Sequence, residues 1–189
     1  GHFNIDERQS LQGVMGGKVV WNDLDNDGYL DLVISGRMSY VSSGEGYPFI
    51  YRNVNGILEQ VPMYFRGTAY NGDIIFGDLD NDGDNDFSID GMYELDGLYG
   101  TDILVYINNG NMYFSNDQTI SLISGESAMS CSDFNNDGRS DISFMGMNRN
   151  RDENDWYGYP LFRLFINDNN YELFDSRIRL TQCQSGDME

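Results

Sequence analysis

Residues 74–91 read IIFGDLDNDGDNDFSIDG, and closely similar stretches lie before and after them in the chain. Residues 19–36 read VVWNDLDNDGYLDLVISG, and residues 128–146 read AMSCSDFNNDGRSDISFMG. The first acids of the three copies, Asp23, Asp78 and Asp133, are spaced 55 residues apart. A fixed period of this length is typical of proteins built from repeated structural units.

Each repeat is predicted to form four short β-strands. The first strand, at residues 18–22, 73–77 and 128–132, precedes the acidic loop. The second, at 30–35, 85–90 and 140–145, follows the loop and places apolar side chains at alternate positions. The third, at 48–52, 103–107 and 161–166, ends in an Asn-containing turn, and a short apolar fourth strand follows. Four strands in about 50 residues are typical of a β-propeller blade.

The chain is therefore predicted to be all-β, with one domain over residues 1–189 and repeats at about 18–72, 73–127 and 128–189. Residues 1–5 are similar to a fourth strand, so residues 1–17 are assigned to the end of a preceding blade. Three four-stranded antiparallel blades and a stray N-terminal strand make an open or partial propeller, since closed propellers typically have at least four blades. Open sheet faces favour contacts with further blades or chains.

The acidic loop follows the pattern Asp-x-Asp/Asn-x-Asp-Gly-x-x-Asp. Side-chain oxygens at the first, third and fifth positions converge in a tight loop, and Gly at the sixth position permits the turn. A backbone carbonyl at the seventh position and a carboxylate at the ninth complete a set of hard oxygen ligands, which favours Ca²⁺ over Zn²⁺ or Cu²⁺. The predicted ligands of the three calcium sites are Asp23, Asp25, Asp27, the Tyr29 carbonyl and Asp31; Asp78, Asp80, Asp82, the Asp84 carbonyl and Asp86; and Asp133, Asn135, Asp137, the Arg139 carbonyl and Asp141.

Two other interpretations of the loops are disfavoured. An EF-hand shares the first six positions but needs a bidentate Glu at position 12. That position is occupied here by Ile34, Ile89 and Phe144. A polar hairpin turn without a metal would explain a single Asp/Asn/Gly cluster, but three copies at constant spacing favour a common ligand.

On these loops, and on the pair Phe76-Gly77, the repeats resemble FG-GAP/VCBS repeats, the calcium-loop blades of integrin α-subunit propellers and of many bacterial and algal extracellular proteins. The resemblance covers roughly the whole chain. It implies a β-propeller with calcium in the loops between first and second strands, and a secreted or cell-surface location. The chain departs from the family in having Phe-Gly in one copy only and fewer repeats than integrins carry.

Composition excludes several classes of function. The chain has 31 acidic and 11 basic residues and a net charge of −20, which disfavours nucleic acid and acidic membrane surfaces as partners. No apolar stretch is long enough for membrane insertion. His2 is the single histidine, so a Cys/His zinc site and most His-based catalysis are excluded, and no catalytic residues are predicted. Whether Cys131 and Cys183 form a disulfide is left open.

The leading functional prediction is a calcium-binding extracellular structural, adhesion or assembly module that is not an enzyme. Its partner would be a protein, or further blades or chains that complete the propeller or stack. Aromatic residues in the connections at residues 38–47, 92–101 and 147–159 leave open a carbohydrate-binding or carbohydrate-active segment with a glycan ligand. The open flanks leave open a third reading, a protomer of an extracellular filament.

Overall fold

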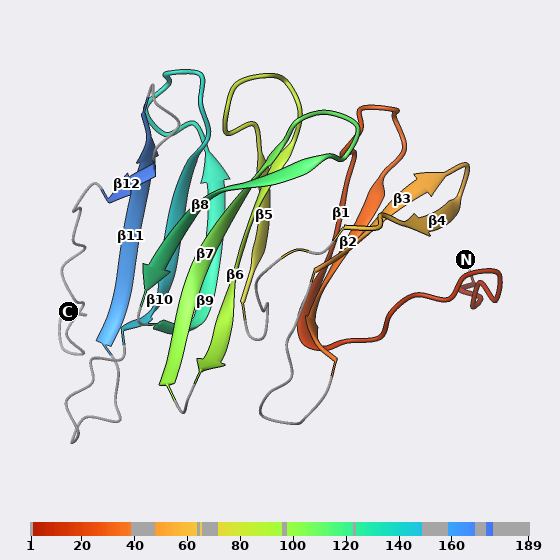
Figure 1. Cartoon of the computed structure of the whole chain (residues 1–189), viewed down its shortest axis with the longest axis horizontal. Coiled ribbons are helices and arrows are strands. Elements are labelled where there is room, and N and C mark those ends of the chain that lie inside the picture. The colour runs from red at the N-terminus through yellow and green to blue at the C-terminus, as the bar shows by residue number, and fades with distance from the viewer. Residues whose placement is uncertain are drawn as a thin grey trace.

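The structure of the chain is a computed structural model that describes residues 2–38, 48–63, 65, 72–95, 98–122, 124–148, 159–168 and 173–175. All regular elements among these residues are β-strands, and they form three antiparallel sheets of four strands each. The sheets lie side by side along the molecule (Figure 1). The predicted all-β fold of four-stranded, propeller-type blades is confirmed.

Each sheet uses four consecutive strands in meander order, which the repeat period requires. The strands are β1 (Met15–Asn22), β2 (Asp31–Arg37), β3 (Phe49–Val54) and β4 (Ile57–Gln60) in the first sheet; β5 (Ile74–Gly77), β6 (Asp86–Leu95), β7 (Leu98–Asn108) and β8 (Phe114–Leu122) in the second; and β9 (Ser124–Ser132), β10 (Asp141–Asn148), β11 (Tyr159–Asn167) and β12 (Leu173–Asp175) in the third. The acidic loops connect β1 to β2, β5 to β6, and β9 to β10.

The strand predicted at residues 1–5 is corrected by the structure, because residues 2–14 contain no strand. Phe3 and Ile5 are exposed, with relative accessibilities of 105% and 90%. A strand is stable when a neighbouring strand satisfies its backbone N–H and C=O groups. No described segment pairs with residues 2–5, so their apolar alternation does not lead to a strand.

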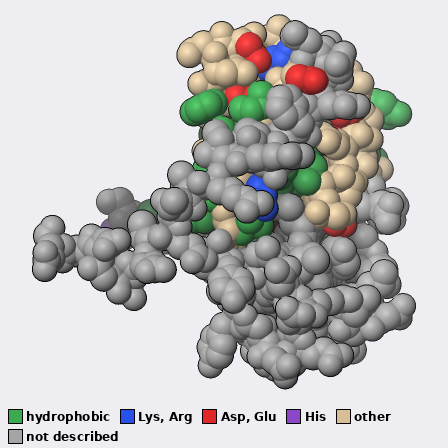
Figure 2. Space-filling model, turned by 90° about the vertical axis from the view of Figure 1, so that its left-hand side faces the viewer, with side chains coloured by type: hydrophobic (Ala, Val, Ile, Leu, Met, Phe, Trp, Pro, Cys, Tyr) green, Lys and Arg blue, Asp and Glu red, His purple; other side chains and the backbone are tan. Residues whose placement is uncertain are grey.

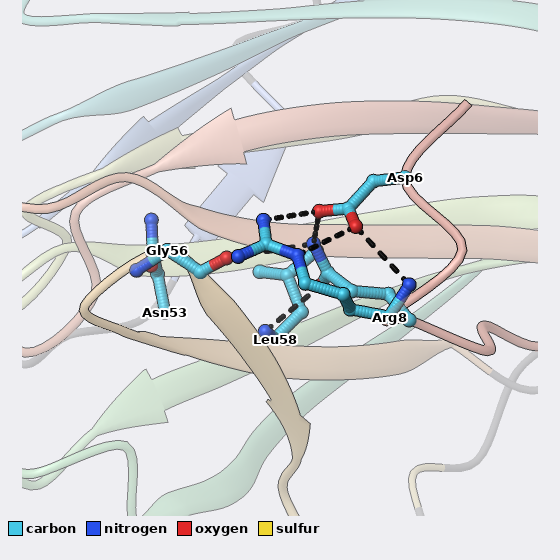
Figure 3. Close-up of polar contacts among 6 residues, drawn as sticks. Asp6, Arg8, Asn53, Gly56 and Leu58 are labelled. Atoms are coloured by element: carbon cyan, nitrogen blue, oxygen red, sulfur yellow. Dashed lines mark hydrogen bonds and ion pairs between the residues drawn. The ribbon is translucent and has the colours of Figure 1, made fainter. Parts of the chain in front are cut away.

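Residues 6–12 instead run beside the β3–β4 hairpin (Figure 3). The Leu58 N–H donates to Gln9 Oε1 over 3.0 Å, and Gln9 Nε2 donates to the Gly56 carbonyl over 3.5 Å. The Arg8 guanidinium donates to both Asp6 oxygens, over 2.8 and 2.6 Å. These bonds fix the segment against the outer edge of the first sheet through side chains rather than by strand pairing.

The β6–β7 hairpin is longer than predicted. The predicted connection at residues 92–101 is mostly strand, since β6 and β7 pair from Phe87 opposite Tyr106 to Leu95 opposite Leu98. Apolar and aromatic residues continue beyond Gly91 as Met92-Tyr93 and Leu98-Tyr99, and aromatic residues favour strand over loop.

Among the described residues, two apolar cores lie between the sheets. Val33 and Ile50 of the first sheet pack with Phe87 and Tyr106 of the second, whose rings stack with centroids 4.8 Å apart. Phe65, from the segment after β4, packs edge-on against the same two rings. Burying a side chain of this size stabilises the fold by about 1.5–3 kcal/mol.

The second core joins the second and third sheets. Ile103 and Val105 of β7 pack with Ile142, Phe144 and Phe165 of the third sheet. The alternation predicted from the sequence therefore places one face of β6 and one face of β10 in an inter-sheet core. In β2 the alternating Leu32 and Ile34 instead pack with Tyr51 in a separate cluster of the first sheet.

Gly77, the second residue of the Phe-Gly pair, allows the first strands of the second and third sheets to approach closely. A Cβ atom added to Gly77 would lie 2.5 Å from Cys131 Sγ and 2.9 Å from Ser140 Oγ. Any side chain at this position would therefore push the third sheet away. Cys183, the other candidate for a disulfide, lies outside the described residues.

Candidate metal centre

The three acidic loops lie at one end of the sheets, at the top of Figure 1, and Figure 2 shows acidic side chains at that end. All three loops adopt the same turn. The fourth position has a left-handed backbone in each copy, and so does the glycine at the sixth; the residues are Asn26 (φ 58°), Asn81 (φ 63°) and Asn136 (φ 58°), with Gly28 (φ 88°), Gly83 (φ 95°) and Gly138 (φ 90°). Asn and Gly tolerate this conformation best, which explains their repetition.

Backbone N–H groups inside each loop orient the carboxylates. In the first loop the Asp27 N–H donates to Asp23 Oδ1 over 3.1 Å, and the Gly28 N–H donates to Asp23 Oδ2 over 3.0 Å. The Asp27 N–H also reaches Asp25 Oδ1 at 3.3 Å, and the Tyr29 N–H donates to Asp27 Oδ1 over 2.9 Å. The second and third loops repeat this pattern. The backbone thus gathers the side-chain oxygens at the first, third and fifth positions.

The ninth-position carboxylates are buried and fasten each loop to the third strand of its sheet. Asp86 accepts the Leu79 N–H over 2.6 Å and the Asn108 N–H over 2.7 Å, one on each oxygen. Asp31 and Asp141 do the same in the other copies. The sequence predicted these residues only as ligands, and the structure adds a structural role.

Burial also changes the protonation of these groups. Desolvation raises the pKa of Asp86 to about 7, and desolvation raises the pKa of Asp31 as well. In the second loop, burial and then the neighbouring Asp82 charge raise the pKa of Asp80. A bound cation would offset both the desolvation and the repulsion between carboxylates, because it favours their ionised form.

Two of the three loops gather three carboxylates each. One ligand oxygen from each of Asp23, Asp25 and Asp27 lies within 4.8 Å of the others. The same holds for Asp78, Asp80 and Asp86. Oxygens on opposite sides of a calcium ion are about 5 Å apart, since Ca–O distances are about 2.3–2.6 Å. Both groups are therefore of suitable size for calcium.

The third loop is not among the described groups of three acidic ligands. Its third position is Asn135, whose Nδ2 donates to Asp137 Oδ2 over 2.8 Å and so places an N–H, not an oxygen, toward the neighbouring carboxylate. The count of three sites is therefore not supported, although Asp133 and Asp141 occupy the same places as in the other loops. Ligation by the seventh-position carbonyls of Tyr29, Asp84 and Arg139 stays a prediction. The same holds for ligation by Asp31 and Asp82, which are outside the two gathered groups.

Each of the first two loops is also held by the sheet that follows it. Buried Asn108, at the end of β7, donates from Nδ2 to the Leu24 carbonyl of the first loop over 2.7 Å. Buried Asn167, at the end of β11, donates to the Leu79 carbonyl of the second loop over 2.6 Å. Asn26 Nδ2 also joins the first loop to Asp84 Oδ1 of the second, over 2.7 Å. Loop geometry and inter-sheet packing are therefore linked.

Sequence reasoning found these asparagines but interpreted them only as turn residues. Their recurrence at the end of every third strand was the available signal. An ion pair between Arg52 Nη2 and Asp25 Oδ2 was also missed. The repeat could not predict this ion pair, because the residue 55 positions after Arg52 is Ile107, which carries no charge.

Comparison with known proteins supports part of the resemblance. Residues 23–89 match the family model of the FG-GAP-like repeat. The match begins at the first acid of the first loop and ends within β6, so it includes both groups of three carboxylates. This stretch of the chain is therefore similar to an FG-GAP-like repeat. The chain matches no curated protein.

Two remaining predictions concern other parts of the chain. Among the described residues, no helix is long and apolar enough to span a membrane. The aromatic connections predicted at residues 38–47 and 147–159 lie largely outside the described residues, so a glycan site there has no structural description.

Proposed function

We propose that this chain is a calcium-binding, non-catalytic module of an extracellular β-propeller, with a structural, adhesive or assembly role. The observation that carries the proposal is the pair of acidic groups in neighbouring loops, each with three carboxylate oxygens within 4.8 Å of one another. The match of the same residues to the FG-GAP-like repeat supports it.

Calcium fits these groups better than other common ions. The ligands are carboxylate oxygens, which hard cations prefer, and calcium accepts a wider range of coordination geometries than magnesium. The carboxylates of each loop repel one another, and a bound divalent cation offsets part of that repulsion. Because Asn108 ties the first loop to the second sheet, metal bound in that loop would stabilise the packing of sheets as well as the loop itself.

An extracellular setting follows from the expected affinity. Calcium sites in extracellular modules have dissociation constants of about 10⁻⁴ to 10⁻³ M, so they fill where calcium is abundant. A structural role suits these loops, because the first two are hydrogen-bonded to the sheet that follows them. The partner is proposed to be a further blade or chain that packs on an end sheet, since sheet faces in such stacks seek partners.

Thermal unfolding tests the proposal. At calcium tenfold above the dissociation constant, each site that binds only the folded chain adds about 1.4 kcal/mol to the free energy of unfolding. We expect the melting temperature to rise on adding calcium and to fall on adding EDTA, with magnesium giving a smaller rise. A melting temperature that is the same in calcium and in EDTA would contradict the proposal.

A further inference from the structure

A basic residue from outside the first loop reaches one of its carboxylates. Arg52, near the end of β3, forms an ion pair between its Nη2 and Asp25 Oδ2. The Asp25 side chain is 1% exposed, while that of Arg52 is 46% exposed. The guanidinium therefore covers a carboxylate that is one of the three gathered in the first loop.

Among the residues that the structure describes, none forms an equivalent ion pair in the second loop. The residue 55 positions after Arg52 is Ile107, which packs in the core between the second and third sheets. No ion pair reaches Asp78, Asp80 or Asp82 from any residue that the structure describes. The first and second loops have the same backbone turn, but only in the first does a described basic side chain pair with one of the gathered carboxylates.

A guanidinium and a calcium ion compete for Asp25. If Arg52 stays in place, its charge repels the incoming cation across a few ångströms at the edge of the loop. If Arg52 leaves, its ion pair with a buried carboxylate is lost. Both routes lower the affinity of the first loop for calcium, and neither operates in the second loop.

We propose that Arg52 is a resident counter-ion of the first loop, which weakens calcium binding there, so that the second loop fills at lower calcium than the first. The inference rests on the proposed function. It assigns to Arg52 the control of calcium affinity at one of two sites whose loops share the same backbone turn. The Arg52 side chain is part-exposed and can withdraw to solvent.

The experiment measures calcium affinity at the first loop alone. Asp80→Asn weakens the second loop, and Tb³⁺, which takes the same oxygen ligands as calcium, is excited through Trp21 at the end of β1, two residues before the first loop. Trp156→Phe removes the other tryptophan. Calcium then displaces Tb³⁺, which gives the calcium dissociation constant.

Arg52→Gln in this background is expected to raise calcium affinity at the first loop about tenfold, because the competing positive charge is removed. Arg52→Lys keeps the charge and is expected to stay close to the parent. Arg8→Gln is the matched control, because Arg8 pairs with Asp6 outside the loops and its removal changes the net charge equally. It is expected to leave the affinity unchanged. Arg52→Met, which keeps side-chain length, replaces Arg52→Gln if that variant unfolds.

Two results would overturn the inference. If Arg52→Gln and Arg52→Met leave the first-loop affinity unchanged or lower it, while the intact second loop still binds calcium, Arg52 is not a competitor and the proposed function stands. If neither loop binds calcium in the unchanged protein or in the Arg52 variants, the proposed function fails as well.

Discussion

The second sheet and the third sheet differ in how they are covered, although their sequences repeat. The second sheet has a described neighbour on each face, and Leu79 in its acidic loop is 4% exposed. The described residues place a sheet on one face of the third, and Phe134 at the same repeat position is 60% exposed. The Leu79 carbonyl accepts a hydrogen bond from Asn167 of the next sheet. No described side chain donates to the Phe134 carbonyl.

The difference shows that a loop of this kind is completed by its neighbour. The backbone turn forms in all three copies from local N–H to carboxylate bonds. The residue at the second position of the loop is buried by the following sheet, and an asparagine of that sheet donates a hydrogen bond to its carbonyl. Calcium affinity and inter-sheet contact should therefore depend on each other where the neighbour is present.

The largest expected effect is a difference in the free energy of unfolding between alanine variants of Leu79 and Phe134. Leu79→Ala should lower the free energy of unfolding by about 3 kcal/mol, because it removes buried contacts and leaves a cavity. Phe134→Ala should change it by less than about 0.5 kcal/mol, since the ring is mostly exposed. Urea unfolding of both variants measures the difference, and equal losses would show that the two loops are covered alike.

The next effect compares asparagines at the ends of third strands. Asn108→Ala should cost about 2 kcal/mol, because it leaves the buried Leu24 carbonyl without its donor. The matched variant is Asn53→Ala, whose Nδ2 donates over 2.9 Å to the more exposed Leu30 carbonyl within its own sheet. We expect a cost of less than about 1 kcal/mol there. A larger loss for Asn53→Ala, again in urea unfolding, would argue against inter-sheet clamping.

A smaller effect concerns pH and Asp90. Asp90 is buried in the second sheet, whereas Met145, at the same repeat position in the third, is 59% exposed. Burial raises the pKa of Asp90 to about 6, although Ser127 and the Asp73 N–H, at 2.5 Å, hydrogen-bond to it. A carboxyl whose pKa is raised on folding binds its proton more tightly in the folded state. Its contribution to stability is therefore full below about pH 4 and is lost as pH rises through about 6.

Without metal, this group should lower the free energy of unfolding by at least about 1 kcal/mol between pH 4 and pH 7, at 1.36 kcal/mol for each unit of pKa shift. Asp90→Asn removes the titration. Unfolding in EDTA at several pH values should show a flatter pH dependence in that variant than in the unchanged protein. Identical slopes would mean that Asp90 does not titrate in this range.

The smallest expected effect is at the third loop. Asp133→Asn should leave the calcium-dependent rise in melting temperature within about 1 °C of the unchanged protein, because this loop does not gather three carboxylates. Asp78→Asn, at the same position of the second loop, should reduce the rise clearly. A comparable reduction in both variants would restore the third site that the sequence predicts.

The sequence predicted the strands and the loops because both depend on local chemistry. Alternating apolar residues such as Phe87 and Ile89 must share a face, and the Asp and Gly positions specify the turn. Contacts between repeats were harder to predict. The burial of Asp86 and the hydrogen bond from Asn108 to the first loop depend on how two sheets pack. The Arg52–Asp25 ion pair depends on a residue that is not repeated.

Calorimetric titration with calcium tests the central claim most directly, namely that the first two loops are calcium sites. The unchanged protein should bind two ions, and Asp80→Asn should lose one of them while the other remains. Asp80 is among the gathered oxygens of the second loop, and the substitution keeps its size and one oxygen. Absence of calcium binding to the unchanged protein at millimolar calcium, or an undiminished count in Asp80→Asn, would contradict the account.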